Sequence, residues 1–451
     1  MAGWLLVLLL VVTIVFIVVA TARYALHPFL ALLAAAYGLG LLAGQSPGDV
    51  VAAIVEGFGG TVGGIGIIIA AGTIIGVVLE RSGGAQVMAD AIIGLVGKAR
   101  SVMAMSLTGA VVSVPVFCDS GYVVLSPLAR SLASRSGRSM ATYAVALSMG
   151  LYATHVFIPP TPGPIAAAGE LDADIGLVIL LGLVVTIPVL VTTYLFAVTV
   201  GERIFIDPDT VSIEDPSEGH AAPPSDGDRV ARPETWQAFL PIVLPIALIA
   251  LNSLAAAVLG EGMIASFLQF LGNPNTALLL GVAAAFLVTA RTRGPSLTQD
   301  AVGRALRVAG PIILITGAGG ALGSVLRSTP ITGFLSDSLV LTSLGIFLPF
   351  LLAAALKTAQ GSSTVAIVTS AAIIAPLVGS LGLDSATGLA LVTLAIGAGS
   401  MTVSHANDSF FWVVSQFSGM STPQAYKLQT VSSGIAGVTG ILAIWILSLI
   451  L

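Results

Sequence analysis

The stretch KTAQGSST at 357–364 interrupts an apolar run that extends from 339 to 380. Lysine, glutamine and hydroxyl side chains are costly to bury in hydrocarbon, because no water is present there to satisfy their polar groups. Such residues are tolerated at membrane depth only inside protein or beside a water-filled cavity. A long apolar run that is broken in this way predicts a re-entrant hairpin, which enters and leaves on one side of a membrane.

The composition assigns the whole chain to the membrane class. Of the 451 residues, 56% are hydrophobic and 9% are charged, whereas a soluble domain has about 25% charged residues. This difference excludes a water-soluble enzyme and predicts a multi-pass membrane protein. Charge is concentrated in 201–235, a hydrophilic segment that we interpret as a cytoplasmic linker. The sequence has no basic patch for nucleic acid, and its single cysteine, Cys118, excludes a disulfide framework.

Apolar runs long enough for helices recur along the chain, and the strand-type alternation of an outer-membrane barrel is absent. We expect an all-α fold built from the runs 4–22, 28–44, 50–79, 101–129, 140–158, 174–200, 236–259, 275–290, 301–326, 339–380, 386–403 and 425–451. No basic region precedes the first run, which we therefore interpret as a retained span rather than a signal peptide. The segment 84–98 is too polar to span and is expected to lie along the interface.

Three other apolar runs contain polar, glycine-rich or proline-rich interruptions. They are PVFCDSGY at 115–122, HVFIPPTPGP at 155–164 and SHANDSFF at 404–411. Together with 357–364, they predict two re-entrant hairpins and two broken helices. The hairpins are expected at 101–135 and 339–380, and the broken helices at 140–164 and 386–411.

The two halves of the chain share a weak repeat, with matching residues separated by about 247 positions. His27-Pro28 matches Asn273-Pro274, and Gly150 matches Gly397. We expect two inverted-topology repeats, 1–200 and 236–451, each with about five spanning helices and one re-entrant hairpin.

The distribution of basic residues predicts how the chain is oriented in the membrane. With the N-terminus outside, every Lys and Arg except Arg327 and Lys357 falls on the cytoplasmic side, as the positive-inside rule requires. Both termini are then periplasmic. Inverted halves with broken helices are the architecture of a secondary transporter.

The two hairpin tips carry groups that suit a carboxylate or a polyol, because half-helix ends point at a midplane site in such folds. A purely structural interpretation is that small residues there permit close helix packing. The candidate residues are Asp119, Ser120 and Gly121 in the first tip, and Gln360, Gly361, Ser362, Ser363 and Thr364 in the second.

Charged residues within the membrane runs are few. Asp119 and Asp408 are expected to mark a proton or cation route, or else to pair with a base such as His155 or Lys357. His155 and His405 are either proton carriers or buried hydrogen-bonding groups. Lys357 either neutralises an anionic substrate or extends to the outer interface.

Other chemistry finds no support in the sequence. It has no nucleotide-binding loop and no dinucleotide fingerprint, and its four histidines lack metal-ligand spacing. We expect no cofactor and no metal. Ser404-His405 alone does not form a catalytic set, so an intramembrane enzyme is not expected.

Five stretches, at 59–85, 114–128, 155–168, 357–377 and 395–421, together resemble the gluconate permease (GntP) family of the ion transporter superfamily. The resemblance implies a bacterial inner-membrane symporter for gluconate or a related hydroxy-acid, usually driven by protons. It also implies a homodimer in lipid that works by an elevator-type movement.

In that superfamily the hairpin tips and the facing helix breaks line the substrate site. The resemblance therefore implies that Asp119 to Gly121 face Pro160 to Gly163, and that Gly361 to Thr364 face His405 to Asp408. The site residues that it adds are Pro160, Thr161, Gly163, Asn407 and Asp408.

One departure bears on the substrate. The first hairpin reads PVFCDSGY, whereas many relatives resemble PVFFEVGF at this place. A shorter acid and an added hydroxyl change reach and polarity where substrate should bind. Gluconate, another sugar acid, glycerate and D-serine all stay open, as do sodium coupling and an uncoupled facilitator or channel.

Overall fold

The computed structural model describes residues 3–24, 26–97, 100–210, 233–258, 262–293, 295–329, 344–406 and 408–451, and these ranges contain helices but no strand. The first part of the chain forms α1 (Gly3–Ala22), α2 (Pro28–Leu42), α3 (Pro47–Ser82), α4 (Gly84–Val96), α5 (Ser101–Val112), α6 (Cys118–Ser136), α7 (Met140–Phe157), α8 (Pro162–Glu170) and α9 (Ile175–Phe196), followed by the π-helical turn η2 (Ala197–Gly201) and the 3-10 turn η3 (Pro208–Thr210). The second part forms α10 (Thr235–Val258), α11 (Met263–Gly272), α12 (Pro274–Arg293), α13 (Pro295–Arg327), α16 (Phe347–Gln360), α17 (Ser363–Ile374), η4 (Ala375–Leu377), α18 (Ala386–Met401), α19 (Ser409–Phe417), α20 (Thr422–Ala425), η5 (Tyr426–Thr430) and α21 (Val431–Ile450).

The described part of the chain contains five helices that are long and apolar enough to cross a membrane, or six if a bent pair counts as one span. The bent pair joins α11 to α12 at an angle of 60°. The sequence pattern does not predict α11, whereas the bounds of α1, α2, α10 and α12 lie within a few residues of the predicted runs. The fold is therefore that of an all-α membrane protein.

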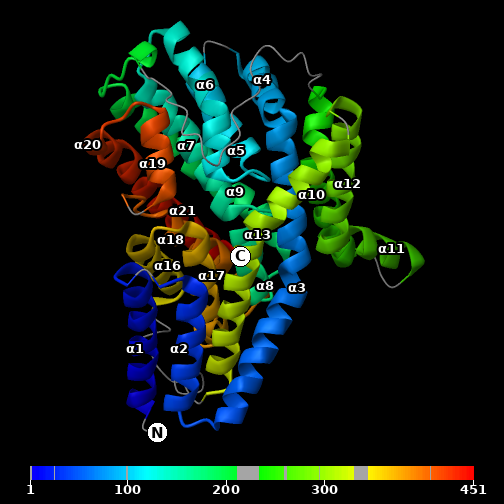
Figure 1. The fold of residues 1–451 in the computed structure, drawn as a ribbon, viewed down its shortest axis with the longest axis vertical. Helices are drawn as coiled ribbons and strands as arrows, with labels where there is room; N and C mark the ends of the chain where they lie inside the picture. Colours follow the sequence, from blue (N-terminus) through cyan, green and yellow to red (C-terminus); the bar gives the residue numbers. More distant parts are fainter. Residues whose placement is uncertain are drawn as a thin grey trace.

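The long helices α3 and α13 run side by side through the molecule (Figure 1). Glycines allow their backbones to approach closely, because a side chain on Gly57 would collide with the backbone of Gly320. We refer to this pair of helices, α3 and α13, as the long wall. Helix α8 packs against α3 and α13, and α17 packs against α13.

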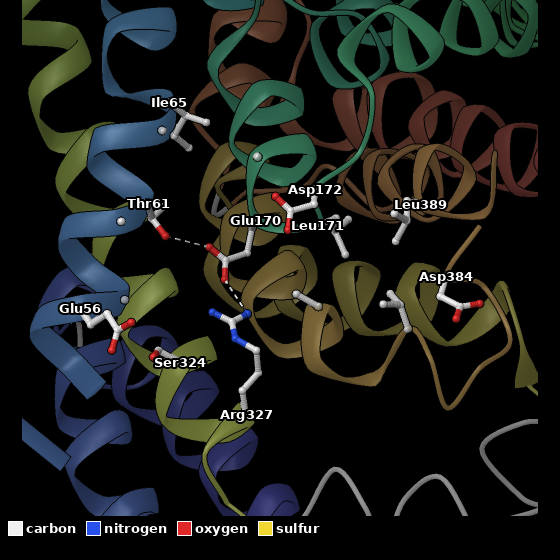
Figure 2. A pocket seen from close by; sticks show the side chains of 16 residues that line it. Glu56, Thr61, Ile65, Glu170, Leu171, Asp172, Ser324, Arg327, Asp384 and Leu389 are labelled. Carbon is white, nitrogen blue, oxygen red and sulfur yellow. Dashed lines mark hydrogen bonds and ion pairs between the residues drawn. The ribbon is translucent and has the colours of Figure 1, made fainter. Parts of the chain in front are cut away.

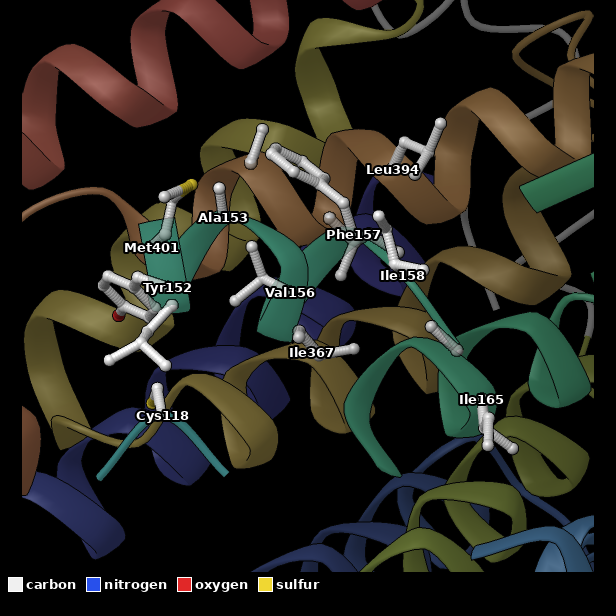
Figure 3. Close-up of a cluster of buried hydrophobic side chains, with 14 of the residues drawn as sticks. Cys118, Tyr152, Ala153, Val156, Phe157, Ile158, Ile165, Ile367, Leu394 and Met401 are labelled. Atoms are coloured by element: carbon white, nitrogen blue, oxygen red, sulfur yellow. The ribbon is translucent and has the colours of Figure 1, made fainter. Parts of the chain in front are cut away.

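Helices α7 and α18 form the centre of the molecule. Every residue of α7 is buried, and so is nearly all of α18. Figure 3 shows how Val156, Phe157 and Ile158 fill the space between Ile367 of α17 and Leu394 of α18. The broken segment α7–α8 is thus enclosed by protein, as irregular backbone at membrane depth requires.

Gly150→Val is expected to destabilise the protein, because a Cβ at Gly150 would collide with the Ser106 carbonyl where α7 crosses α5. Overpacking of this kind costs about 1–3 kcal/mol. Thermal unfolding of the purified protein in detergent measures the effect. Gly63→Val is the matched control, since a Cβ there meets nothing within 4 Å. Equal melting temperatures for the two variants would contradict the packing of α5 on α7.

All four predicted interruptions are breaks between helices, and each has a local cause. Pro115 lacks a backbone N–H and lies between α5 and α6, and Pro159 and Pro160 lie between α7 and α8. Gly361 ends α16 with a φ of 83°, and the Ser362 side chain caps α17.

Two of the breaks differ in position from the sequence pattern. The first lies at 113–117, so that Asp119, Ser120 and Gly121 belong to the first turn of α6 instead of a loop. The fourth lies at 402–408 and contains neither glycine nor proline. It ends at Asp408, whose carboxylate caps α19. The described residues on either side of each break therefore form well-defined helix ends.

Residues 201–210, at the start of the predicted linker, contact the helical body. The Met140 amide donates to the Ile206 carbonyl, and Arg130 Nε donates to the Pro208 carbonyl at 2.7 Å. The rest of the predicted linker up to 232 lies outside the described residues. Helix α10 begins at Thr235, where the predicted linker ends.

Candidate functional site

A buried ion pair lies where the second hairpin meets the second broken helix. Lys357 Nζ, on the last turn of α16, is 2.6 Å from Asp408 Oδ2, and the side chains are 0% and 5% exposed. Lys357 also donates to the Gly361 carbonyl at 2.5 Å. The lysine therefore does not extend to the interface, one of the two roles predicted for it. It holds the turn of the hairpin and Asp408 together.

Asp408 is well supplied with further donors. Its Oδ2 accepts a hydrogen bond from Ser404 Oγ at 2.5 Å, and its Oδ1 accepts from the Phe410 amide at 3.1 Å. The pairing of Asp408 with Lys357 is one of the alternatives that the sequence leaves open. Charge-assisted bonds of this type are stronger than neutral ones, and they fix the carboxylate in place.

Tyr152 of α7 joins this site to the second hairpin tip. Its hydroxyl is 2.7 Å from Ser363 Oγ, and Lys357 Nζ is 5.8 Å from the centre of its ring. The ring face thus contributes a cation–π interaction. Ser363 and Thr364 are partly buried in the first turn of α17, whereas the side chain of Gln360 is not among those described. The tip offers hydroxyl groups beside a buried cation.

The first hairpin brings a second carboxylate to the same place. Asp119 Oδ1 accepts from Ser409 Oγ at 3.2 Å, and Asp119 Oδ2 is 3.6 Å from the Cys118 thiol. Ser409 directly follows Asp408, so the two carboxylates are close neighbours. These bonds link the first hairpin to the second broken helix, across the two halves of the chain. Ser120 and Gly121 lie on the same turn of α6, and Gly121 packs against Leu151.

The first broken helix packs in the reciprocal way. Gly163 of α8 contacts Ile367 of α17, the helix after the second hairpin tip. Thr161 is buried, and its hydroxyl donates to the Ile158 carbonyl at 2.8 Å. Pro160 packs against Gly72 of α3. Gly163 therefore contacts the helix that follows the second hairpin tip, whereas Pro160 packs on α3 and Thr161 bonds within its own break. Asp119, Lys357, Ser363 and Asp408 carry the polar groups.

The two candidate histidines have different surroundings. His155 is buried, its ring lies 5.8 Å from that of Phe117, and its Nδ1 has no hydrogen-bond partner among the described residues. His405 Nε2 is 2.9 Å from the Thr358 carbonyl. Asn407 lies outside the described residues.

Sequence reasoning misses three side chains of this site. Tyr152, Ser404 and Ser409 each contact a predicted residue. Ser404 and Ser409 lie within the predicted break 404–411, whereas Tyr152 lies inside α7 and gives no signal by its spacing. Within the described ranges, no group of three or more His, Cys, Asp or Glu side chains is arranged to hold a metal ion. The chemistry available here is that of one cation, two carboxylates and several hydroxyl groups.

The sequence profile of the GntP family permeases matches residues 5–450. The chain belongs to the GntP permease family. It is 34% identical to the gluconate permease of Pseudomonas aeruginosa, over 98% of this chain and 97% of the relative. It is also 34% identical to the inner membrane permease YgbN of Escherichia coli and 32% identical to the D-serine transporter DsdX of Escherichia coli, in both cases over nearly the full length of both chains.

Solved structures support the fold of this GntP family member. The YdaH transporter of Alcanivorax borkumensis aligns with a TM-score of 0.66 at 15% identity, over 93% of this chain and 98% of that one. MtrF of Neisseria gonorrhoeae aligns with a TM-score of 0.63 at 13% identity. The GntP chain is thus a multi-pass secondary transporter with a transporter fold.

Proposed function

We propose that the protein imports gluconate or a related small hydroxy-carboxylate together with protons. The observation that carries this proposal is the buried pair of Lys357 and Asp408 beside the hydroxyl groups of the second hairpin. A buried lysine is a receptor for a carboxylate, and its present partner is itself a carboxylate. A substrate carboxylate can therefore replace Asp408 at Lys357 Nζ.

The charges of the site argue for coupling to a cation. Asp119, Asp408 and Lys357 sum to one net negative charge, and an anionic substrate adds a second. Accumulating charge in a poorly hydrated site is costly, so that binding of the anion favours uptake of a proton. Asp119 and Asp408 are the leading candidates to accept it, with His155 and His405 as further candidates.

The remaining polar groups suit a polyol chain. Ser363 and Tyr152 already exchange a hydrogen bond, and Ser362 and Thr364 lie on the same turn. Asp119 of the first hairpin and Ser409 beside the second broken helix add a carboxylate and a further hydroxyl group, which bond to one another. We infer that the further lining comprises Ser120, Gly121, Pro160, Thr161, Gly163, Gln360, Gly361 and Asn407.

We infer that the halves 1–200 and 236–451 are inverted repeats. Thr192 Oγ1 and Thr439 Oγ1, 247 positions apart, lie 3.1 Å from one another, as expected of equivalent residues beside a two-fold axis. Helices α3 and α13 also pack together, while α2 packs on α13 and α12 on α3. This reciprocal packing supports the inverted repeats. We further propose periplasmic termini, a homodimer and an elevator-type movement, because the family resemblance implies them.

Uptake into liposomes tests the function. Under an inward proton gradient of one pH unit, we expect the purified protein to accumulate labelled gluconate about tenfold for one proton per substrate. Accumulation driven by sodium alone would contradict proton coupling, and equilibration without accumulation would indicate a facilitator. D-serine is the second substrate to test, because a relative at 32% identity transports it. Preference for D-serine over sugar acids would contradict the proposed substrate class.

A further inference from the structure

A cavity lies away from the hairpin tips, between the helix pair α3 and α13 and the end of α8. Its volume is about 710 Å³, and carboxylates line it from several elements: Glu56 of α3, Glu170 of α8, Asp172 in the following turn and Asp384 before α18. Arg327 of α13 is the one cation among the described lining residues. The cavity thus carries net negative charge, which attracts cations and repels a carboxylate substrate.

Glu170 differs from the other carboxylates of this cavity. Its side chain is only 4% exposed, whereas Glu56, Asp172 and Asp384 are exposed. Thr61 donates to Glu170 Oε2 at 3.2 Å. Oε1 accepts no hydrogen bond within the described residues, and the nearest cation atom, Arg327 Nη1, is 3.7 Å away. Figure 2 shows this carboxylate between Thr61 and Arg327 at the wall of the cavity.

We propose that Glu170 is a further coupling residue, which binds a proton from this cavity. Glu170 Oε1, which accepts no hydrogen bond from the described residues, can hold a proton without breaking one. Protonation removes the charge that attracts Arg327, whose half-exposed guanidinium can be hydrated instead. The other titratable groups that face Glu170 are the carboxylates of Glu56, Asp172 and Asp384, which concentrate protons near it.

Helix α8 connects this event with the candidate substrate site. The helix begins at Pro162, immediately after the break at Pro160 and Thr161, and ends at Glu170. Nine helical residues span about 13 Å. At its first turn α8 contacts Ile367 of α17, and at its last turn Gly169 contacts Ile65 of α3. When the ion pair between Glu170 and Arg327 breaks, the C-terminal end of α8 is attached less firmly to α13. The N-terminal end of α8 keeps its contact with α17.

Two measurements on labelled gluconate, its exchange and its accumulation, distinguish a coupling residue from a structural one. The proposal rests on the proposed function, so wild-type accumulation of gluconate is measured first. Glu170→Gln is expected to keep exchange of labelled gluconate, at equal pH on both sides, within about twofold of wild type. Under a gradient of one pH unit, its accumulation should fall from about tenfold toward one, because one of the groups that bind the coupled proton is missing. Asp172→Asn, an exposed carboxylate of the same cavity, should accumulate like wild type.

A spectroscopic measurement makes the test independent of transport. Infrared difference spectra on acidification should contain a protonated-carboxyl band that Glu170→Gln removes and Asp172→Asn retains. Accumulation by Glu170→Gln equal to wild type, or the same band in both variants, would overturn the proposal. If wild type fails to accumulate gluconate while the band depends on Glu170, the proposed transport function fails and proton binding at Glu170 stands.

The cavity itself can be tested with matched glycine variants of α3. Gly60 lines the cavity, Gly63 does not, and a Cβ at either position meets nothing within 4 Å. Gly60→Leu fills part of the cavity and should slow proton-driven accumulation of gluconate, whereas Gly63→Leu should not. Equal rates in the two variants would contradict proton access through this cavity.

Discussion

Lys357→Met is expected to abolish gluconate transport and to lower the free energy of unfolding by about 3–5 kcal/mol, the cost of leaving one member of a buried ion pair alone. Asp408 would keep its bonds from Ser404 and the Phe410 amide but lose Lys357, its one cation partner among the described residues. Uptake into liposomes and denaturant unfolding in detergent measure the two effects.

The double variant Lys357→Met/Asp408→Asn separates stability from function. Removing both charges leaves no uncompensated ion, so most of the lost stability should return. Transport should not return, because no cation remains to receive the substrate carboxylate. Lys427→Met, which removes an exposed lysine, is the control and should behave like wild type. Uptake by the double variant at the wild-type rate would show that Lys357 does not bind substrate.

Ser363→Trp is expected to abolish transport without loss of folded protein. Ser363 begins α17 at the hairpin tip, is only partly buried, and shares a hydrogen bond with Tyr152. An indole there would replace the hydrogen bond to Tyr152 and obstruct the hairpin tip. Size-exclusion chromatography and thermal unfolding check the fold, and liposome uptake checks the function.

Two comparisons sharpen the Ser363 prediction. Ser363→Ala loses one neutral hydrogen bond, worth about 1 kcal/mol, and should therefore reduce uptake by less than about tenfold. Ser134→Trp places the same indole on the exposed end of α6 and should transport normally. Normal uptake by Ser363→Trp would remove the second hairpin tip from the substrate site.

Much of the fold follows from local signals in the sequence. Apolar runs give the helices, and prolines or a glycine followed by serine explain three of the four breaks. The fourth break contains neither proline nor glycine. It ends where Asp408 caps α19, and in the sequence only the polar residues around Asp408 indicate it. The first break was displaced because Asp119 and Ser120 look like loop residues, yet acids and serines are also favoured in the first turn of a helix.

The sequence predicts which residues of the site are charged or polar, but it predicts less well which of them contact one another. Asp119, Lys357 and Asp408 stand out because charge is scarce in the membrane runs. Their hydrogen-bond and ion-pair partners depend on which helices pack together. Contacts between helices that are distant in the sequence cannot be inferred from local residue spacing. The crossed arrangement, with Asp119 on Ser409 and α17 on α8, is therefore known only from the structure.

The burial of the broken segment α7–α8 has a consequence for how such a protein can adapt to different bilayers. The window within Met140–Glu170 is 100% buried inside the protein, whereas those of Ile175–Gly201 and Thr422–Ile450 are 44% and 33% buried. Hydrophobic matching to acyl-chain length thus falls to the outer helices α9 and α21, because the described window of α7–α8 is enclosed by protein. Substitutions that adapt α9 and α21 to a thicker or thinner bilayer can therefore accumulate without changing the packing of α7 and α8.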